Sequence, residues 1–297
     1  MASVAIVGPG SVGAFFAAHL AAAGHVVLSC ARRPFTEFIV ESPDAPVRIA
    51  ADVATDPLDR RLDRLVDVVL LCVKAHQTAG AAPWLDRLCR PGVALVTVQN
   101  GLEGEERATP YARDAEVIAG VVYCGAELVA PGHVVHSSGR RLILPDVAPA
   151  RAVVDAIGGS PARIVIADDY VTEAWRKLGA NVVLNGTTGL TLRSMEVLRE
   201  SGMARLAGEL LRECWRVGRA AGAVLSDDDA DQFAAGLAAM PDGGLTSMLQ
   251  DRRAGRPTEH DAIYGSVVRA GIRHGVPTPF ADTMLALLSA ASVAKPA

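Results

Sequence analysis

The sequence predicts an α/β protein in which a parallel sheet covered by helices is followed by an all-helical domain. The first half of the 297 residues alternates short β-rich runs with helical stretches, a pattern typical of a parallel sheet. After residue 167 the pattern is helical almost throughout. Because the chain is also about twice a typical domain length, we expect two domains, at 1–167 and 168–297.

In the first half, the expected strands are short apolar runs separated by helical patterns or turns. Val4–Val7 is continuously apolar, as expected of a strand buried on both faces. The elements that follow are a helix to Ala23, strands at Val26–Cys30 and Asp67–Val73, a helix at Gln77–Leu88 and a strand at Val93–Val98. Beyond these, runs separated by turns predict an antiparallel extension of the same sheet, at Val117–Tyr123, Glu127–Val129, His133–His136 and Arg141–Leu144, with Arg163–Ala167 as the last strand.

The second half is expected to consist of helices. Asp169 suits the N-cap of a helix that begins near Tyr170. Further helices are expected at Ser194–Ala221, Asp227–Met240, Leu245–Ala254, Glu259–His274 and Pro279–Ala291. These apolar helices could bury a dimer face or pack within a monomer, so a homodimer is one of two open possibilities.

The composition argues against several classes of protein. A net charge of −4 does not fit a general nucleic-acid-binding surface. No apolar run approaches the ~20 residues that a membrane helix needs. The five cysteines are dispersed and form no CxxC pair, which indicates buried thiols in a reducing compartment, so we expect a cytoplasmic protein. No His/Cys cluster has metal-ligand spacing, and we expect no metal site.

A glycine motif lies between the first expected strand and the first helix. It reads Gly8, Pro9, Gly10, Ser11, Val12 and Gly13, which is the GxGxxG pattern in its required context. The first glycine permits a tight turn, the second lets the backbone approach a pyrophosphate, and the third lets helix and strand pack closely. The sequence therefore predicts an N-terminal Rossmann dinucleotide-binding domain followed by an all-helical C-terminal domain. The alternative is a glycine turn without a ligand.

The end of the second strand indicates which dinucleotide binds. An NAD enzyme usually carries Asp or Glu there, whereas an arginine accommodates the 2′-phosphate of NADP. This chain has Cys30, Ala31, Arg32 and Arg33, with no carboxylate before Glu37. We therefore expect NADPH, held by Arg32 or Arg33; the alternative is a solvated pair of loop arginines.

Two further polar residues follow expected strands, at the carboxyl ends where ligands bind in such sheets. Lys74 comes directly after Asp67–Val73, and Asn100 follows Val93–Val98. Each alone could be a strand cap or an ordinary turn. Together they favour a ligand site.

A polar row marks the first helix of the second half. Lys177, Asn181 and Asn185 are four residues apart, so they project from one face, and apolar residues flank them. Asparagine is a poor residue inside a helix, and a buried amide is costly without partners. The row therefore favours a ligand that supplies those partners, against the alternative of a solvent-facing stripe.

Together these residues resemble the ketopantoate reductase (2-dehydropantoate 2-reductase) family, and the resemblance covers essentially the whole chain. The most distinctive segments are Trp175-Arg176-Lys177-Leu178, Thr246-Ser247-Met248-Leu249-Gln250-Asp251 and Thr258-Glu259. The resemblance implies hydride transfer from NADPH to the C2 ketone of ketopantoate, giving pantoate, with a small-molecule 2-keto acid as the substrate.

The resemblance also implies a role for each matching residue. Lys177 would be the general acid. Asn181, Asn185 and Ser247 would hold the substrate, and Asn100 would lie between substrate and nicotinamide. Arg32, Lys74, the backbone near Ala126, and Glu259 would hold NADPH with the glycine motif.

Two positions depart from the family pattern. Gly244 stands where the family usually has an asparagine three residues before the serine, and a second asparagine is replaced within Arg193-Ser194-Met195. Ketopantoate remains the leading substrate. The alternatives are the same chemistry on another branched 2-keto acid, or a non-catalytic NADPH-sensing protein.

Overall fold

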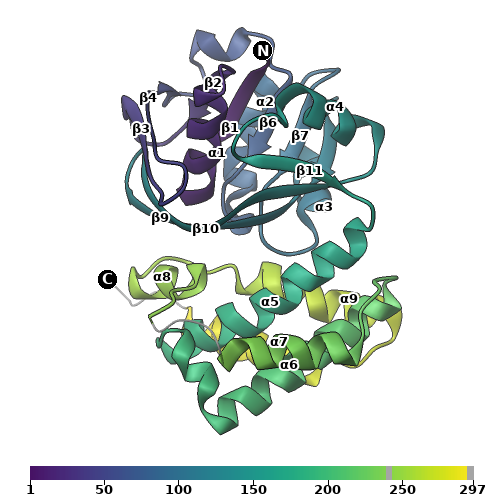
Figure 1. Cartoon of the computed structure of the whole chain (residues 1–297). Helices are drawn as coiled ribbons and strands as arrows, with labels where there is room; N and C mark the ends of the chain where they lie inside the picture. The colour runs from purple at the N-terminus through teal and green to yellow at the C-terminus, as the bar shows by residue number, and fades with distance from the viewer. Residues whose placement is uncertain (239–242, 293–297) are drawn as a thin grey trace. The chain divides into compact units, whose positions relative to one another are not determined.

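The computed structural model describes residues 1–238 and 243–292. The chain divides into two compact units, Met1–Tyr170 and Val171–Ala297 (Figure 1). The first unit contains both strands and helices and the second is helical, which confirms the expected α/β fold class.

The first unit is built on a parallel sheet. Its six strands lie in the order β5 (Asp52–Ala54), β2 (Val26–Cys30), β1 (Ser3–Val7), β6 (Val68–Leu71), β7 (Ala94–Thr97) and β8 (Glu116–Ala119). Each neighbouring pair is parallel. The strand order reverses between β1 and β6, so the loops after these two strands flank the crevice where ligands of such sheets bind.

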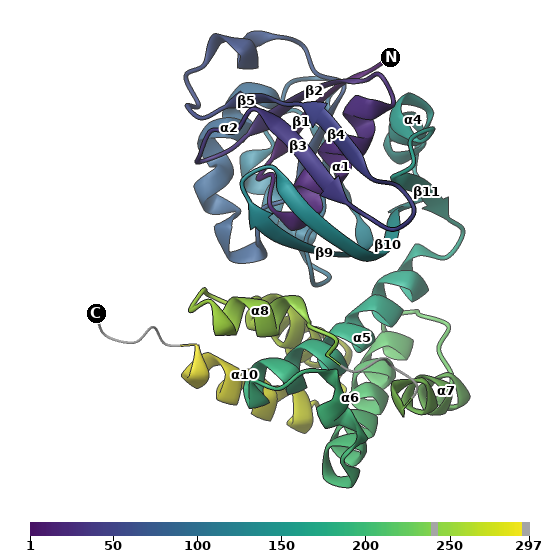
Figure 2. The same ribbon diagram turned by 60° about the vertical axis from the view of Figure 1, so that its left-hand side comes forward.

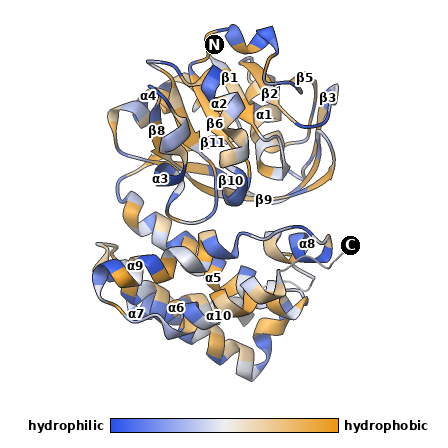
Figure 3. Ribbon diagram, turned by 180° about the vertical axis from the view of Figure 1, so that it is seen from behind, coloured by the Kyte–Doolittle hydropathy of each residue, from blue (hydrophilic) through white to orange (hydrophobic). Residues whose placement is uncertain are grey.

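Apolar residues cover both faces of this sheet, as the unbroken apolar runs require. Val4 and Ile6 of β1 point into one core, whereas Ala5 and Val7 point into the other. In Figure 3 the central strands β1 and β6 are coloured as hydrophobic. Helix α2 (Ala82–Leu88) covers the second face, and α3 (Gly104–Ala108) follows β7.

The antiparallel extension of the sheet is a wrong prediction, because residues 117–144 mostly form a second sheet. It contains β4 (Val47–Ala50), β3 (Glu37–Glu41), β10 (His133–Pro145) and β11 (Arg163–Ala167), with β9 (Val121–Ala130) paired to β10 (Figure 2). Gly120 separates β8 from β9. A Cβ at Gly120 would lie 3.0 Å from the Thr97 carbonyl oxygen and 2.7 Å from Leu142 Cδ1, so glycine lets the chain pass close to β7 and β10 at this point.

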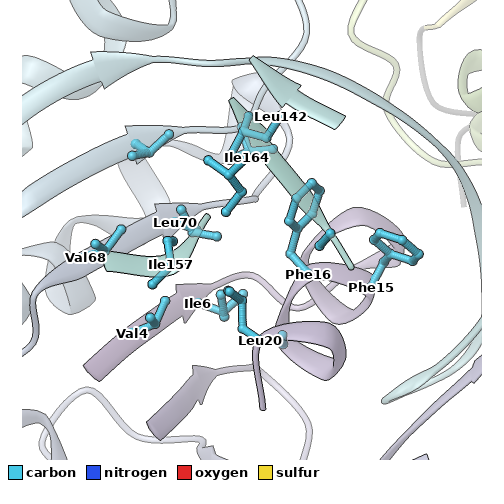
Figure 4. Packing of buried hydrophobic residues seen from close by; sticks show 14 of the residues in the cluster. Val4, Ile6, Phe15, Phe16, Leu20, Val68, Leu70, Leu142, Ile157 and Ile164 are labelled. Carbon is cyan, nitrogen blue, oxygen red and sulfur yellow. The ribbon is translucent and has the colours of Figure 1, made fainter. Parts of the chain in front are cut away.

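The helix α1 (Ser11–Ala22) packs between the two sheets. It contacts β1 and β2 on one side and β3, β4, β9 and β10 on the other. In Figure 4 side chains of α1, β1 and β6 converge with those of β10, α4 (Ala148–Ile157) and β11 in one core. The second sheet thereby fixes the helix that follows the glycine motif.

The second unit consists of helices arranged around α5. The helices are α5 (Tyr170–Thr191), α6 (Ser201–Ala220), α7 (Asp227–Ala238), α8 (Ser247–Arg253), α9 (Ser266–His274) and α10 (Pro279–Ala291). Helix α5 carries Gly186 and Gly189, whose missing side chains leave room for Tyr264 and Met248. The tyrosine hydroxyl donates a hydrogen bond to the Val182 carbonyl at 2.5 Å.

Several helix boundaries differ from the sequence prediction for identifiable reasons. The helix expected over Ser194–Ala221 is interrupted, because Glu200 is extended between a 3₁₀ turn (Met195–Arg199) and α6. Helix α8 starts two residues later than expected because the Thr246 side chain caps it. The helix expected from Glu259 begins with a π-helical turn, Asp261–Gly265, ahead of α9. The end of the helix expected over Asp227–Met240 lies outside the described residues.

Candidate active site

The glycine motif forms a tight turn at the carboxyl end of β1. Gly8 has φ +86°, and a Cβ there would lie 2.5 Å from Val73 Cγ1, so the turn passes directly beside the end of β6. A Cβ at Gly13 would lie 2.5 Å from the Gly8 carbonyl oxygen. Both positions therefore require glycine for the fold alone.

Gly10 differs from the other two glycines. It is the N-cap of α1, and a Cβ there would meet nothing within 4 Å. The first turn of α1 carries no acidic residue, and no side chain caps it. The first N–H groups of a helix lack partners within the helix and carry partial positive charge. This turn therefore has the open space and the donors that a dinucleotide pyrophosphate needs.

Arg32 and Arg33 lie directly after β2, the strand next to β1. Both side chains are exposed. Neither guanidinium has a hydrogen-bond or ion-pair partner among residues 1–238 and 243–292. At the end of β2, desolvation raises the pKa of the buried Cys30 thiol to about 12. This thiol is therefore neutral near pH 7 and places no negative charge beside the arginines. The strand end thus offers two guanidiniums and no carboxylate.

Lys74 and Asn100 follow β6 and β7, at the same edge of the sheet as Gly8. Gln99, which was not predicted as a site residue, links these two strand ends. Its Nε2 donates to the Val73 carbonyl at 3.0 Å and to the Thr78 hydroxyl at 2.9 Å. The only sequence signal for this crosslink was a glutamine directly before the turn at Asn100. Ala126, also expected near the cofactor, lies half-buried on β9, opposite His136 of β10.

In the second unit, the expected polar row lies on α5, where Asn181 and Asn185 are each 6% exposed and Lys177 is half-buried. The row is therefore not a solvent-facing stripe. The Asn185 Nδ2 donates to Asn181 Oδ1 at 3.0 Å. Since the backbone N–H of Met248 also donates to Asn185 Oδ1, at 3.0 Å, the orientation of both amides is determined.

In this orientation the two asparagines make different hydrogen bonds. The Asn185 oxygen is used by α8, accepting from the Met248 N–H and from the Ser247 hydroxyl at 3.1 Å. The Asn181 oxygen is used by Asn185, so the donor groups of Asn181 are its Nδ2 hydrogens. Lys177, one turn earlier, is also a donor. The row thus has hydrogen-bond donors at its N-terminal end, suited to the oxygens of a keto acid.

Glu259 lies just before the π-helical turn and is 6% exposed. Its backbone carbonyl accepts the N–H of Ile263 at 3.0 Å. π-Helical turns within helices occur frequently at functional sites. Among the expected residues, the structure brings Asn181, Asn185 and Ser247 into one hydrogen-bonded group in the second unit.

The two departures from the family pattern contact each other. A Cβ at Gly244 would overlap the Met195 Cε, so the methionine fills the space of the missing side chain. The backbone N–H of Met195 also donates to the Gly244 carbonyl at 3.1 Å. A flexible thioether side chain therefore occupies the space beside Gly244.

His76 is exposed on a short 3₁₀ turn. No cluster of three or more potential metal ligands occurs in the described ranges. No helix there is long and apolar enough to span a membrane.

Comparisons with known proteins cover both units. Residues 4–149 match the family model "Ketopantoate reductase PanE/ApbA", and residues 169–292 match "Ketopantoate reductase PanE/ApbA C terminal". The 2-dehydropantoate 2-reductase of Caulobacter vibrioides is 36% identical over 294 residues, covering 99% of this chain and 100% of its own. That of Mycobacterium tuberculosis is 36% identical over 290 residues, covering 97% of each chain.

Among solved structures, a dimeric ketopantoate reductase from Staphylococcus aureus is 26% identical, with a TM-score of 0.85 over 98% of both chains. The family models together span most of the chain, and the relatives match it nearly end to end. The chain therefore belongs to the ketopantoate reductase family.

Proposed function

We propose that this protein catalyses the NADPH-dependent reduction of 2-dehydropantoate to pantoate. The observation that carries the proposal is family membership over both units, at 36% identity to reductases of that name. The chemistry of Lys177 and Asn181 on α5 agrees with it, because both carry hydrogen-bond donors and a keto acid presents acceptor oxygens at its reacting end.

The residues of the first unit fit a bound NADPH. The open space at Gly10 and the first turn of α1 suit the pyrophosphate, and the exposed guanidiniums of Arg32 and Arg33 suit the 2′-phosphate. We assign Lys74, Asn100, the backbone near Ala126, and Glu259 to further contacts with the cofactor. Bound NADPH would supply the hydride that adds to C2 of the substrate.

In this proposal Lys177 is the general acid. Its ammonium stabilises the negative charge that develops on the C2 oxygen and then transfers a proton to it, so the product gains a hydroxyl. Asn181 donates to a substrate oxygen through Nδ2, and Ser247 contacts the substrate beside it. Asn185 holds Asn181 and Ser247 in place through the hydrogen bonds described above.

The test is the loss of NADPH absorbance with a panel of 2-keto acids. We expect turnover with ketopantoate and a clear preference for NADPH over NADH. Binding of NADPH without turnover of any keto acid in the panel would instead support a non-catalytic NADPH-binding protein.

A second candidate substrate is another branched 2-keto acid. The apolar Met195 side chain beside Gly244 favours this possibility, because neither position carries an amide that a hydroxyl of the substrate could use. A higher kcat/KM for an apolar branched keto acid than for ketopantoate would establish it.

We also propose a cytoplasmic homodimer. The Staphylococcus aureus relative is dimeric, and all five cysteines of this chain are free, as in a reducing compartment. Light scattering on the purified protein tests the dimer: a mass near one chain would contradict it. Cell fractionation tests the location.

A further inference from the structure

A pair of buried hydroxyls joins α5 to the N-terminus of α8. The Oγ1 atoms of Thr188 and Thr246 are 2.6 Å apart. Thr188 is fully buried and Thr246 is 8% exposed. Thr188 lies one turn beyond Asn185, and Thr246 directly precedes Ser247, so this pair adjoins the proposed substrate-binding group.

The partners of each hydroxyl set the direction of the hydrogen bonds. Thr246 Oγ1 accepts the N–H of Leu249 at 3.2 Å, which is the N-cap bond of α8. Thr188 Oγ1 lies 2.7 Å from the Leu184 carbonyl, which can only accept. A hydroxyl has one proton to donate. The Thr188 hydroxyl therefore donates to the Leu184 carbonyl, and the Thr246 hydroxyl donates to Thr188 Oγ1.

We propose that Thr188 is a positioning residue that sets the place of Ser247 through Thr246. Without the Thr188 oxygen, the buried Thr246 hydroxyl loses its acceptor and must rotate to find another, which weakens its cap on Leu249. The first turn of α8 then moves relative to Asn185, whose oxygen receives both Ser247 and Met248. This inference rests on the proposed function for its effect on catalysis.

The chain offers a matched control in the neighbouring residue. Thr187 is also fully buried, and its hydroxyl bonds the Val183 carbonyl at 2.5 Å within the same helix. No hydrogen bond from Thr187 reaches another helix of the described chain. Thr187→Val and Thr188→Val thus remove the same group at the same burial, but only the second removes the link to α8.

The first measurement is hydrogen exchange of the Met248 and Leu249 amides, which needs no activity. In Thr188→Val we expect exchange of both to be about tenfold faster, as the loss of about one hydrogen bond implies. Thr187→Val should leave them at the parental rate, and Thr188→Ser should restore protection. Unchanged exchange in Thr188→Val, or an equal change in Thr187→Val, would overturn the proposal.

The second measurement is steady-state kinetics. For Thr188→Val we expect KM for the keto acid to rise about tenfold, while NADPH affinity stays within about twofold of the parent. Thr188→Ser should return KM to the parental value. A parental KM in Thr188→Val would refute the positioning role even if exchange were faster. If the parent itself turned over no keto acid, the proposed function would fail, and the exchange data would still decide whether Thr188 holds α8.

Discussion

Met195 fills the space that a side chain at position 244 would occupy. The methionine lies in a 3₁₀ turn before α6, and Gly244 lies in the segment that leads into α8. A Cβ built on the glycine overlaps the Met195 Cε, and the two backbones share a hydrogen bond of 3.1 Å. The identity of one residue therefore limits the identity of the other.

This relationship predicts coupled mutational effects on stability. Gly244→Ala should lower the free energy of unfolding by about 1 kcal/mol, because the end of the methionine side chain must move to make room for the methyl group. In a Met195→Ala background the same change should cost clearly less, with a coupling energy of about 0.5 kcal/mol or more. Urea unfolding of the four proteins measures this cycle. Equal costs in both backgrounds would mean that the two residues do not compete for space.

Gly10 and Gly13 should respond differently to alanine. A Cβ at Gly13 would lie 2.5 Å from the Gly8 carbonyl oxygen and 2.9 Å from Cys72 Cβ, so Gly13→Ala should destabilise the fold by about 1–3 kcal/mol. Gly10→Ala meets nothing within 4 Å and should leave the melting temperature unchanged. It should nevertheless weaken NADPH binding by about tenfold or more, since the added methyl lies where the pyrophosphate approaches. Thermal melts and fluorescence titrations make the comparison. Parental NADPH affinity in Gly10→Ala would place the pyrophosphate elsewhere.

Arg32→Ala should discriminate between the two nicotinamide cofactors. A charged hydrogen bond to the 2′-phosphate contributes about 1.5–3 kcal/mol, so the Kd for NADPH should rise by about 10- to 100-fold. The Kd for NADH, which lacks that phosphate, should change little. Arg33→Ala is the companion variant, because both side chains are exposed and follow the same strand. An equal loss of both cofactors in Arg32→Ala would assign the phosphate to Arg33 or to another cation.

His19 should make the protein less stable in acid. This α1 residue is fully buried, both of its ring nitrogens lack partners in the described chain, and desolvation lowers its pKa to about 4. The unfolded chain has the higher pKa, about 6.5, so it binds the proton more readily. The contribution of neutral His19 to the free energy of unfolding is therefore fully present above about pH 6.5. As the pH drops towards 4, the free energy of unfolding falls by about 3 kcal/mol.

Urea unfolding at a series of pH values tests this expectation. His19→Leu should flatten the decline between pH 6.5 and 4, whereas His76→Leu, at an exposed position, should leave it in place. An unchanged decline in His19→Leu would assign the acid sensitivity to other groups.

Much of the parallel sheet could be predicted because its strands are continuous apolar runs. The expected strand at Val26–Cys30 has the observed bounds, and the helix expected at Pro279–Ala291 matches α10. The strands of residues 37–54 were not predicted. β5 has only three residues and β4 only four, none of them fully buried in β4, so neither gives a strong hydrophobic pattern. Their place in the sheets depends on pairing with strands that lie far away in the sequence.

The polar row of α5 could be predicted from spacing, but its hydrogen bonds to other elements could not. The four-residue period placed Lys177, Asn181 and Asn185 on one face of a helix. Nothing in that period indicates that the Asn185 oxygen is bound by the first turn of α8, because this contact joins residues 63 positions apart. The same holds for Thr188 and Thr246. Long-range hydrogen bonds are a property of the fold rather than of a local pattern.

The proposed reduction requires a proton donor, and Lys177 is the residue assigned to it. Lys177→Ala should lower kcat by about a hundredfold or more, as the loss of a general acid implies, while the Kd for NADPH stays nearly unchanged. Arg176→Ala is the control, because this neighbouring cation is exposed on the same helix and should leave kcat at the parental value. The decisive measurement is single-turnover reduction of ketopantoate by the two variants at saturating NADPH. A slow Lys177→Ala beside a parental Arg176→Ala supports the proposed general acid, and a parental rate in Lys177→Ala would contradict it.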